Sequence, residues 1–140
     1  MIKLYLDIDG VLLTTSHPQA AEDAAEFVAF ITGHFDCYWL TTHCQGNTDT
    51  ALRYLSDYFD DATMILLRTI KPTRWGALKT DAIDFDSKFV WLDDYAMQAE
   101  KEILKKYNAL DSLILVDLNG NNKLTAITKQ LGIILHYNSL

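Results

Sequence analysis

The sequence lacks the features that mark a secreted, disulfide-rich or membrane-embedded protein. Only two cysteines, Cys37 and Cys44, occur among its 140 residues. They cannot build a disulfide framework, and no Cys/His spacing of a zinc site accompanies them. We expect both to be ordinary reduced thiols of a cytosolic protein. The first apolar run stops at Asp7, too early for a signal peptide. No apolar run approaches the ~20 residues that span a bilayer.

Basic residues are also scarce, with 12 Lys and Arg against 19 Asp and Glu and a formal net charge of −7. This excess repels polyanions and argues against nonspecific binding of nucleic acid or an anionic membrane. No internal repeat, linker or biased segment interrupts the chain, whose length suits one domain. Its 49% hydrophobic residues can form a core without disulfides or structural metal. We therefore expect a single soluble, cytoplasmic domain over residues 1–140.

Short apolar runs alternate with longer amphipathic segments. We predict strands within residues 2–8, 37–40, 64–67, 89–92 and 113–116. We predict helices within residues 19–32, 48–58, 79–83 and 96–107, and a last one that Asn122 caps and Gly132 ends. Strands that are apolar on both faces and alternate with helices indicate a parallel sheet covered on both sides. The expected fold is α/β, a Rossmann-like three-layer α/β/α sandwich with a mostly parallel five-stranded sheet.

Polar side chains follow the predicted strands, at the edge where such sheets bind ligands. These residues are Asp7 and Asp9, Thr41 and Thr42, Asp93 and Asp94, and Asp117. A single acid after a buried strand is commonly only a polar terminator. The four carboxylates of Asp7, Asp9, Asp93 and Asp94, gathered at one edge, would repel one another, and holding them ionised requires a cation. Because all the ligands are oxygens, the pattern predicts Mg²⁺ as the cofactor.

These residues resemble the motifs of the haloacid dehalogenase (HAD) superfamily of phosphohydrolases. Residues 7–12, Asp-Ile-Asp-Gly-Val-Leu, look like the first motif. Thr41 looks like the hydroxyl residue of the second motif, and Lys79 like the lysine of the third. Asp93 and Asp94 look like the acidic pair of the fourth. The resemblance covers most of the chain, and all four motifs stand in the family's order.

The resemblance implies a Mg²⁺-dependent phosphatase that acts on a phosphomonoester through an aspartyl-phosphate intermediate. In that family the first aspartate attacks phosphorus, which makes Asp7 the nucleophile. Asp9 would protonate the leaving oxygen and then activate water. Mg²⁺ would bind Asp7, the backbone carbonyl of Asp9, and one acid of the fourth motif. Asp94 is the favoured direct ligand, and Asp93 is the alternative.

Two further positions would bind the substrate phosphate, and each has a competitor. Thr41 is favoured over its neighbour Thr42 for the hydrogen bond to the phosphate. Lys79 is favoured over Lys71, because it heads a short helix just before the fourth strand. All the charged residues between positions 62 and 80 are basic. This segment is either a solvated loop or a positive lip that draws an anionic substrate toward the metal.

Four other side chains are weaker candidates. His43 either lines the pocket or is a plain loop histidine, and His17 follows the first strand near the expected mouth of the site. Trp75 fits a role in covering the core better than one in stacking on a substrate. Cys44 is too isolated to be assigned as a nucleophile.

The intervals between the motifs are too short for the cap domain that many members of this superfamily carry. An open site suits a phosphate on a larger molecule, or needs a partner chain to close it. Receiver domains share the architecture, but their adjacent acids close the first strand, where this chain has Asp7 and Asp9 one residue apart. A catalytically silent HAD-like binding module is the other alternative, against which the intact Asp7/Asp9 pair argues. The sequence names neither the substrate nor the oligomeric state, and phosphotransfer stays an alternative to hydrolysis.

Overall fold

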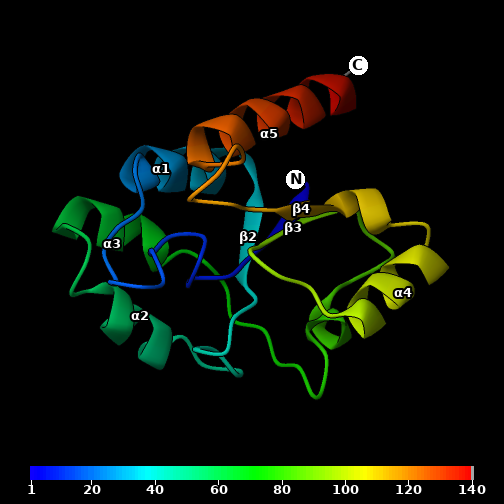
Figure 1. Ribbon diagram of the computed structural model, residues 1–140, viewed down its shortest axis with the longest axis horizontal. Helices are drawn as coiled ribbons and strands as arrows, with labels where there is room; N and C mark the ends of the chain where they lie inside the picture. Colours follow the sequence, from blue (N-terminus) through cyan, green and yellow to red (C-terminus); the bar gives the residue numbers. More distant parts are fainter. Residues whose placement is uncertain (140) are drawn as a thin grey trace.

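Four of the five expected strands form one parallel sheet in the computed structural model, which describes residues 1–139. The strands are β1 (Lys3–Leu6), β2 (Asp36–Trp39), β3 (Phe89–Asp93) and β4 (Leu113–Leu115), in the order β2-β1-β3-β4. The α-helices are α1 (Ala24–His34), α2 (Asp49–Leu55), α3 (Asp61–Leu67), α4 (Gln98–Lys106) and α5 (Leu124–Asn138) (Figure 1). Two 3₁₀ turns, η1 (Lys79–Ala82) and η2 (Leu110–Ser112), complete the elements. The protein is thus α/β, as expected.

Helices cover both faces of the sheet, because successive side chains of a strand point to opposite sides. In β1, Leu4 and Leu6 join the larger apolar cluster, to which α1, α3 and α5 contribute. Tyr5 joins the smaller cluster with Trp91 of β3 and Leu104 of α4. Figure 1 shows α1 and α5 together on one side of the strands and α4 on the other.

The predicted strand at residues 64–67 is wrong, because this segment is helix α3. The Asp60 carboxylate caps the helix by accepting a hydrogen bond from the backbone N–H of Thr63 at 2.9 Å. Met64 and Leu67 are buried on one side of α3, whereas Ile65 is 61% exposed. A run of four apolar residues fits one turn of a helix as well as a short strand, so its composition could not decide between them.

The helix expected from Gln19 begins only at Ala24. The preceding residues fold back on the loop after β1 instead, with the Ala21 N–H donating to the Leu12 carbonyl at 2.8 Å. Leu13 forms an antiparallel bridge with Ala20 in the same fold-back. The segment between residues 14 and 19 is therefore a surface loop beside the carboxyl end of the sheet.

The last helix also differs from expectation at both ends. Lys123, and not Asn122, is its N-cap residue, and the Asn122 amide donates to the Leu115 carbonyl. The helix continues through Gly132 to Asn138.

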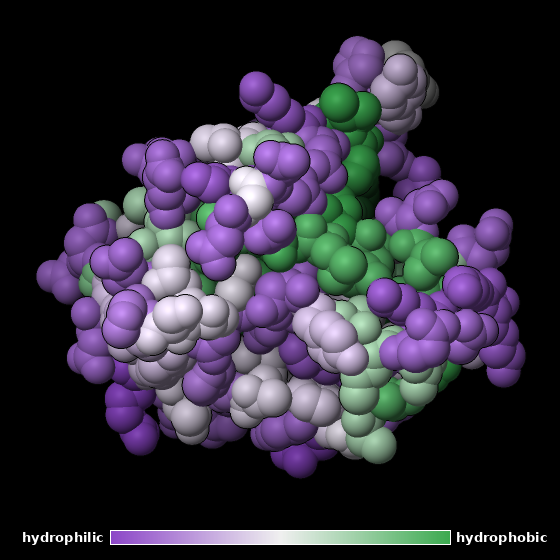
Figure 2. All heavy atoms as spheres, viewed as in Figure 1, coloured by the Kyte–Doolittle hydropathy of each residue, from purple (hydrophilic) through white to green (hydrophobic). Residues whose placement is uncertain are grey.

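Even α5, with 15 residues, is short of a membrane span, and no helix within residues 1–139 is long and apolar enough to be one. Figure 2 shows apolar surface between α5 and the strands.

Candidate active site

A partly buried lysine, Lys79, contacts two carboxylates at the carboxyl ends of β1 and β3. Asp7 and Asp93 continue the alternation of Tyr5 and Trp91, so both side chains point to the face covered by η1 and α4. Lys79, the first residue of η1, reaches them there. Its Nζ lies 2.7 Å from Asp93 Oδ2 and 3.2 Å from Asp7 Oδ2. Three of the predicted site residues, distant in the sequence, therefore meet at one point.

The main chain of Lys79 is fixed by a separate buried group, Glu100 of α4. One oxygen of the Glu100 carboxylate accepts a hydrogen bond from the Lys79 N–H at 2.8 Å. The other accepts one from the Met97 N–H at 2.9 Å, at the start of α4. This carboxylate ties η1 to α4 and sets where the lysine side chain begins.

The charges in this cluster perturb one another. Burial, followed by the nearby Asp7 carboxylate, raises the pKa of Asp93, and Lys79 offsets only part of that rise. Burial alone would lower the pKa of Lys79, but the carboxylates of Asp7 and Asp93 outweigh it and raise the pKa. Lys79 is therefore held as a cation between two acids that repel each other, an arrangement that favours a further positive charge.

Asp94 adds a third carboxylate to this edge. Asp7, Asp93 and Asp94 each offer an oxygen, and these oxygens lie within 4.8 Å of one another. Both oxygens of Asp93 are engaged, one by Lys79 and the other by the N–H of Tyr95 at 3.2 Å. Asp94 is exposed to solvent. An all-oxygen donor set of this kind fits Mg²⁺, and Asp94 is the acid of the pair that is free to turn toward it.

Gly10 holds the Asp94 carboxylate close to the loop after β1. The backbone of Gly10 has a φ of +82°, in the left-handed region that disfavours residues with a Cβ. A Cβ at this position would lie 2.2 Å from Asp94 Oδ2. Because Gly10 has no side chain, the loop can turn at this residue and the Asp94 carboxylate can lie against its backbone.

We predict that Gly10→Ala costs about 1–2 kcal/mol of folding stability from left-handed strain alone and weakens Mg²⁺ binding by displacing Asp94. Urea unfolding and calorimetric titration with Mg²⁺ measure the two effects. The matched control is Gly33→Ala in α1, where a Cβ would meet nothing within 4 Å. The control should be neutral or slightly stabilising, because Ala is the better helix former. Equal behaviour of the two variants would contradict this account of Gly10.

Asp9 does not join the three carboxylates, and its side chain belongs to a separate network. Its Oδ2 lies 2.8 Å from His43 Nε2, and its Oδ1 accepts a hydrogen bond from the Tyr54 hydroxyl at 2.8 Å. The rings of His43 and Tyr54 stack with centroids 4.4 Å apart. Burial and the hydrogen bond to Asp9 raise the pKa of Tyr54 to about 12. Asp7 and Asp9 therefore have different partners, although one residue separates them.

Tyr54 is the site residue that sequence reasoning missed, whereas His43 was considered. The tyrosine lies on α2, and its spacing from Asp9 in the sequence gives no signal of their contact. The rest of this helix displays an ordinary apolar pattern, with Ala51 and Leu55 buried. Only the position of α2 against the loop after β1 reveals the role of Tyr54.

The two threonines after β2 differ in burial. Leu6 of β1 pairs with Trp39 of β2, so the chain beyond each strand leaves the sheet at the same edge. Thr41 is fully buried there, and its Oγ1 accepts a hydrogen bond from the His43 N–H at 3.3 Å. Thr42 is exposed. Burial and this hydrogen bond therefore fix the side chain of Thr41, whereas that of Thr42 is exposed to solvent.

The structure separates Lys71 from this site. Its Nζ lies 2.8 Å from Asp36 Oδ1, at the amino end of β2 and thus at the opposite edge of the sheet. Arg74 packs against Gly46, in the loop after β2. The basic segment therefore forms no continuous lip, and of its members only Lys79 contacts the acidic cluster within the described part of the chain.

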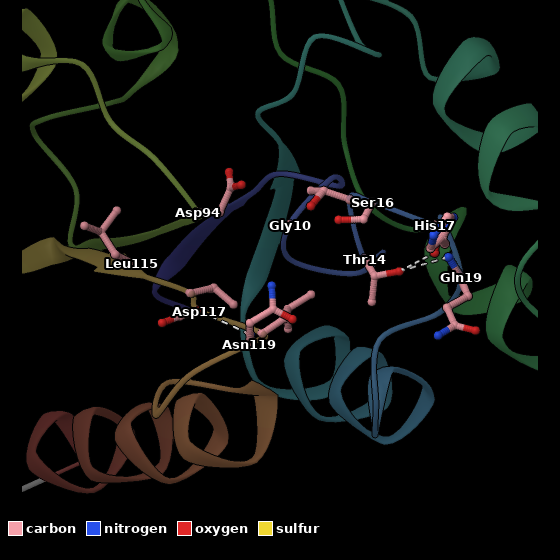
Figure 3. A pocket seen from close by; sticks show the side chains of 12 residues that line it. Gly10, Thr14, Ser16, His17, Gln19, Asp94, Leu115, Asp117 and Asn119 are labelled. Carbon is pink, nitrogen blue, oxygen red and sulfur yellow. Dashed lines mark hydrogen bonds between the residues drawn. The ribbon is translucent and has the colours of Figure 1, made fainter.

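The remaining candidates fall into two groups. His17 lines a cavity of about 630 Å³ beside Asp94 (Figure 3). Trp75 packs on the smaller apolar cluster, in agreement with a core role. Both thiols are buried, and burial raises the pKa of Cys37 to about 12. The two cysteines thus remain structural residues.

In comparisons with known proteins, no family model, curated protein or solved structure matches this chain. The site offers a carboxylate held beside an ammonium group, further carboxylates suited to a divalent cation, and a second carboxylate held apart by hydrogen bonds. Such a set can neutralise a phosphate, attack it and move a proton.

Proposed function

We propose that this protein is a Mg²⁺-dependent phosphohydrolase of the HAD type that cleaves a phosphomonoester. The observation that carries the proposal is the convergence of Asp7, Lys79, Asp93 and Asp94 at the carboxyl edge of a parallel sheet. A structural ion pair would need only one acid for Lys79. The additional carboxylates concentrate negative charge where a cation and a phosphate would together balance it.

In the proposed reaction, a carboxylate oxygen of Asp7 attacks phosphorus and the bond from phosphorus to the alcohol oxygen breaks. Protonated Asp9 gives its proton to that leaving oxygen, which departs as the alcohol. Asp9 then takes a proton from a water that attacks the aspartyl-phosphate. Inorganic phosphate leaves, and the Asp7 carboxylate and protonated Asp9 are restored. Lys79 and Thr41 hold the phosphate oxygens during both steps.

The cation would be held by Asp7 and Asp94, with the backbone carbonyl of Asp9 as a third protein ligand. Asp93 would serve mainly to orient Lys79, since both of its oxygens are already engaged. When bound, Mg²⁺ supplies positive charge that lowers the repulsion between the Asp7 carboxylate and the phosphate. The donor set supports this choice of metal because it contains oxygen atoms only.

Metal removal tests the proposal directly. We expect the purified protein to release p-nitrophenol from p-nitrophenyl phosphate in the presence of Mg²⁺. Excess EDTA should abolish the release, and added Mg²⁺ should restore it. Activity that persists in EDTA would contradict the metal assignment. Calorimetric Mg²⁺ binding without turnover of any phosphoester would instead favour the catalytically silent binding module.

A further inference from the structure

The cavity beside Asp94 is a feature of the surface that the proposed reaction does not use. We infer that it receives the alcohol part of the substrate, and that this alcohol is a neutral, hydroxyl-rich molecule of sugar size. The inference rests on the proposed function, because it names the substrate class of the same site. It also departs from the expectation of a phosphate on a larger molecule.

The position of the cavity links it to the acidic cluster. Gly10 and Asp94 form part of its lining, and both belong to the edge described above. One wall is the loop of residues 14–19, and the other is the segment of residues 115–119 after β4. Figure 3 shows these two walls facing each other. A volume of about 630 Å³ lies within the ~300–1,000 Å³ typical of small-molecule sites.

The lining groups suit hydroxyls and disfavour anions. Asp94 and Asp117 offer carboxylate oxygens that accept hydrogen bonds, and Gln19 and Asn119 offer amides that both donate and accept. None of the described residues that line the cavity is a lysine or an arginine. With Asp94 assigned to the metal, a second phosphate placed here would meet the Asp117 carboxylate and no lysine or arginine, whereas a neutral polyol can donate a hydrogen bond to that carboxylate.

Apolar side chains complete the fit to a sugar-like ring. Leu115, Val116 and Leu118 lie in the same lining as the two carboxylates. Leu115 is 40% exposed, which is unusual for a leucine at the end of a parallel strand. The C–H face of a sugar ring would cover it while the ring hydroxyls reach Asp117. The cavity thus combines polar and apolar contacts as a polyol requires.

The test compares two substrates with the same ring, glucose 6-phosphate and glucose 1,6-bisphosphate. We expect the wild-type protein to favour the monophosphate in kcat/KM by about tenfold or more, because of charge repulsion in the cavity. Asn119→Lys places a cation in the cavity and should shift this ratio toward the bisphosphate by about tenfold. Asn121→Lys is the matched control, an exposed asparagine two positions away that does not line the cavity. The control should leave the ratio unchanged.

The outcomes separate this inference from the proposed function. Equal or better turnover of the bisphosphate by the wild type would overturn the cavity assignment, and so would equal shifts in the two lysine variants. In both cases release of p-nitrophenol from p-nitrophenyl phosphate would still support the proposed function. Absence of turnover with every phosphoester would overturn the proposed function and this inference with it.

Discussion

Asp7→Asn is expected to reduce phosphate release by about 10³-fold or more, because an amide cannot act as the attacking group. The folded structure should survive the change. Asn is nearly isosteric with Asp, and the substitution removes one of the two like charges that flank Lys79. Thermal unfolding should show equal or higher stability, while p-nitrophenyl phosphate assays show the loss of turnover.

Asp111→Asn, an exposed position in η2, provides the matched control and should retain wild-type turnover. The covalent step has its own readout, because radiolabelled phosphate should be trapped on the wild-type chain after rapid acid quenching. No label should remain on Asp7→Asn. Substantial turnover or labelling by that variant would show that another group attacks phosphorus.

The second large effect is expected for Asp9→Asn, and its size should depend on the leaving group. Loss of a general acid commonly costs about 10²–10⁴-fold. This full cost applies to an alkyl phosphate, whose alkoxide is a poor leaving group without a proton. p-Nitrophenolate leaves without protonation, so its release in the first step should fall much less. Parallel assays on glycerol 2-phosphate and p-nitrophenyl phosphate, with burst-phase measurement for the latter, check this difference.

The network around Asp9 supplies the controls for this prediction. Tyr54→Phe and His43→Ala each remove one hydrogen bond to the carboxylate and should give smaller losses, because these side chains position Asp9 without reacting. His43→Gln keeps a donor and should recover part of the activity that His43→Ala loses. If Asp9→Asn slowed both substrates equally, or neither, Asp9 would have no role as an acid.

The sequence allowed the main elements of the site to be predicted because each lies next to a recognisable strand. Asp7 and Asp93 follow strands whose apolar runs are unmistakable, and parallel strands deliver their carboxyl ends to one edge. The prediction of a strand at residues 64–67 was wrong because four consecutive apolar residues show neither the period of a helix nor that of a strand. The choice between Lys79 and Lys71 was open for a different reason. Both precede the same strand, and only their tertiary contacts show that Lys79 lies beside the acidic cluster while Lys71 pairs with Asp36.

The contacts of Asp9 were beyond prediction because they are tertiary. Its partners come from the loop after β2 and from α2, and no local pattern reports where α2 packs. The same holds for the cavity beside Asp94. It exists because the chain folds back between Leu13 and Ala20 before α1 begins, whereas the amphipathic pattern suggested an earlier helix start.

Glu100 accepts a hydrogen bond from the backbone N–H of Lys79, whereas the side chain of Lys79 contacts Asp7 and Asp93. Different residues therefore fix the backbone position of Lys79 and the surroundings of its ammonium group. The side chain at position 79 can be shortened or replaced without loss of the hydrogen bond from its backbone N–H to Glu100, which holds η1 against α4. This division would let a related sequence lose or change its reaction without first losing its fold.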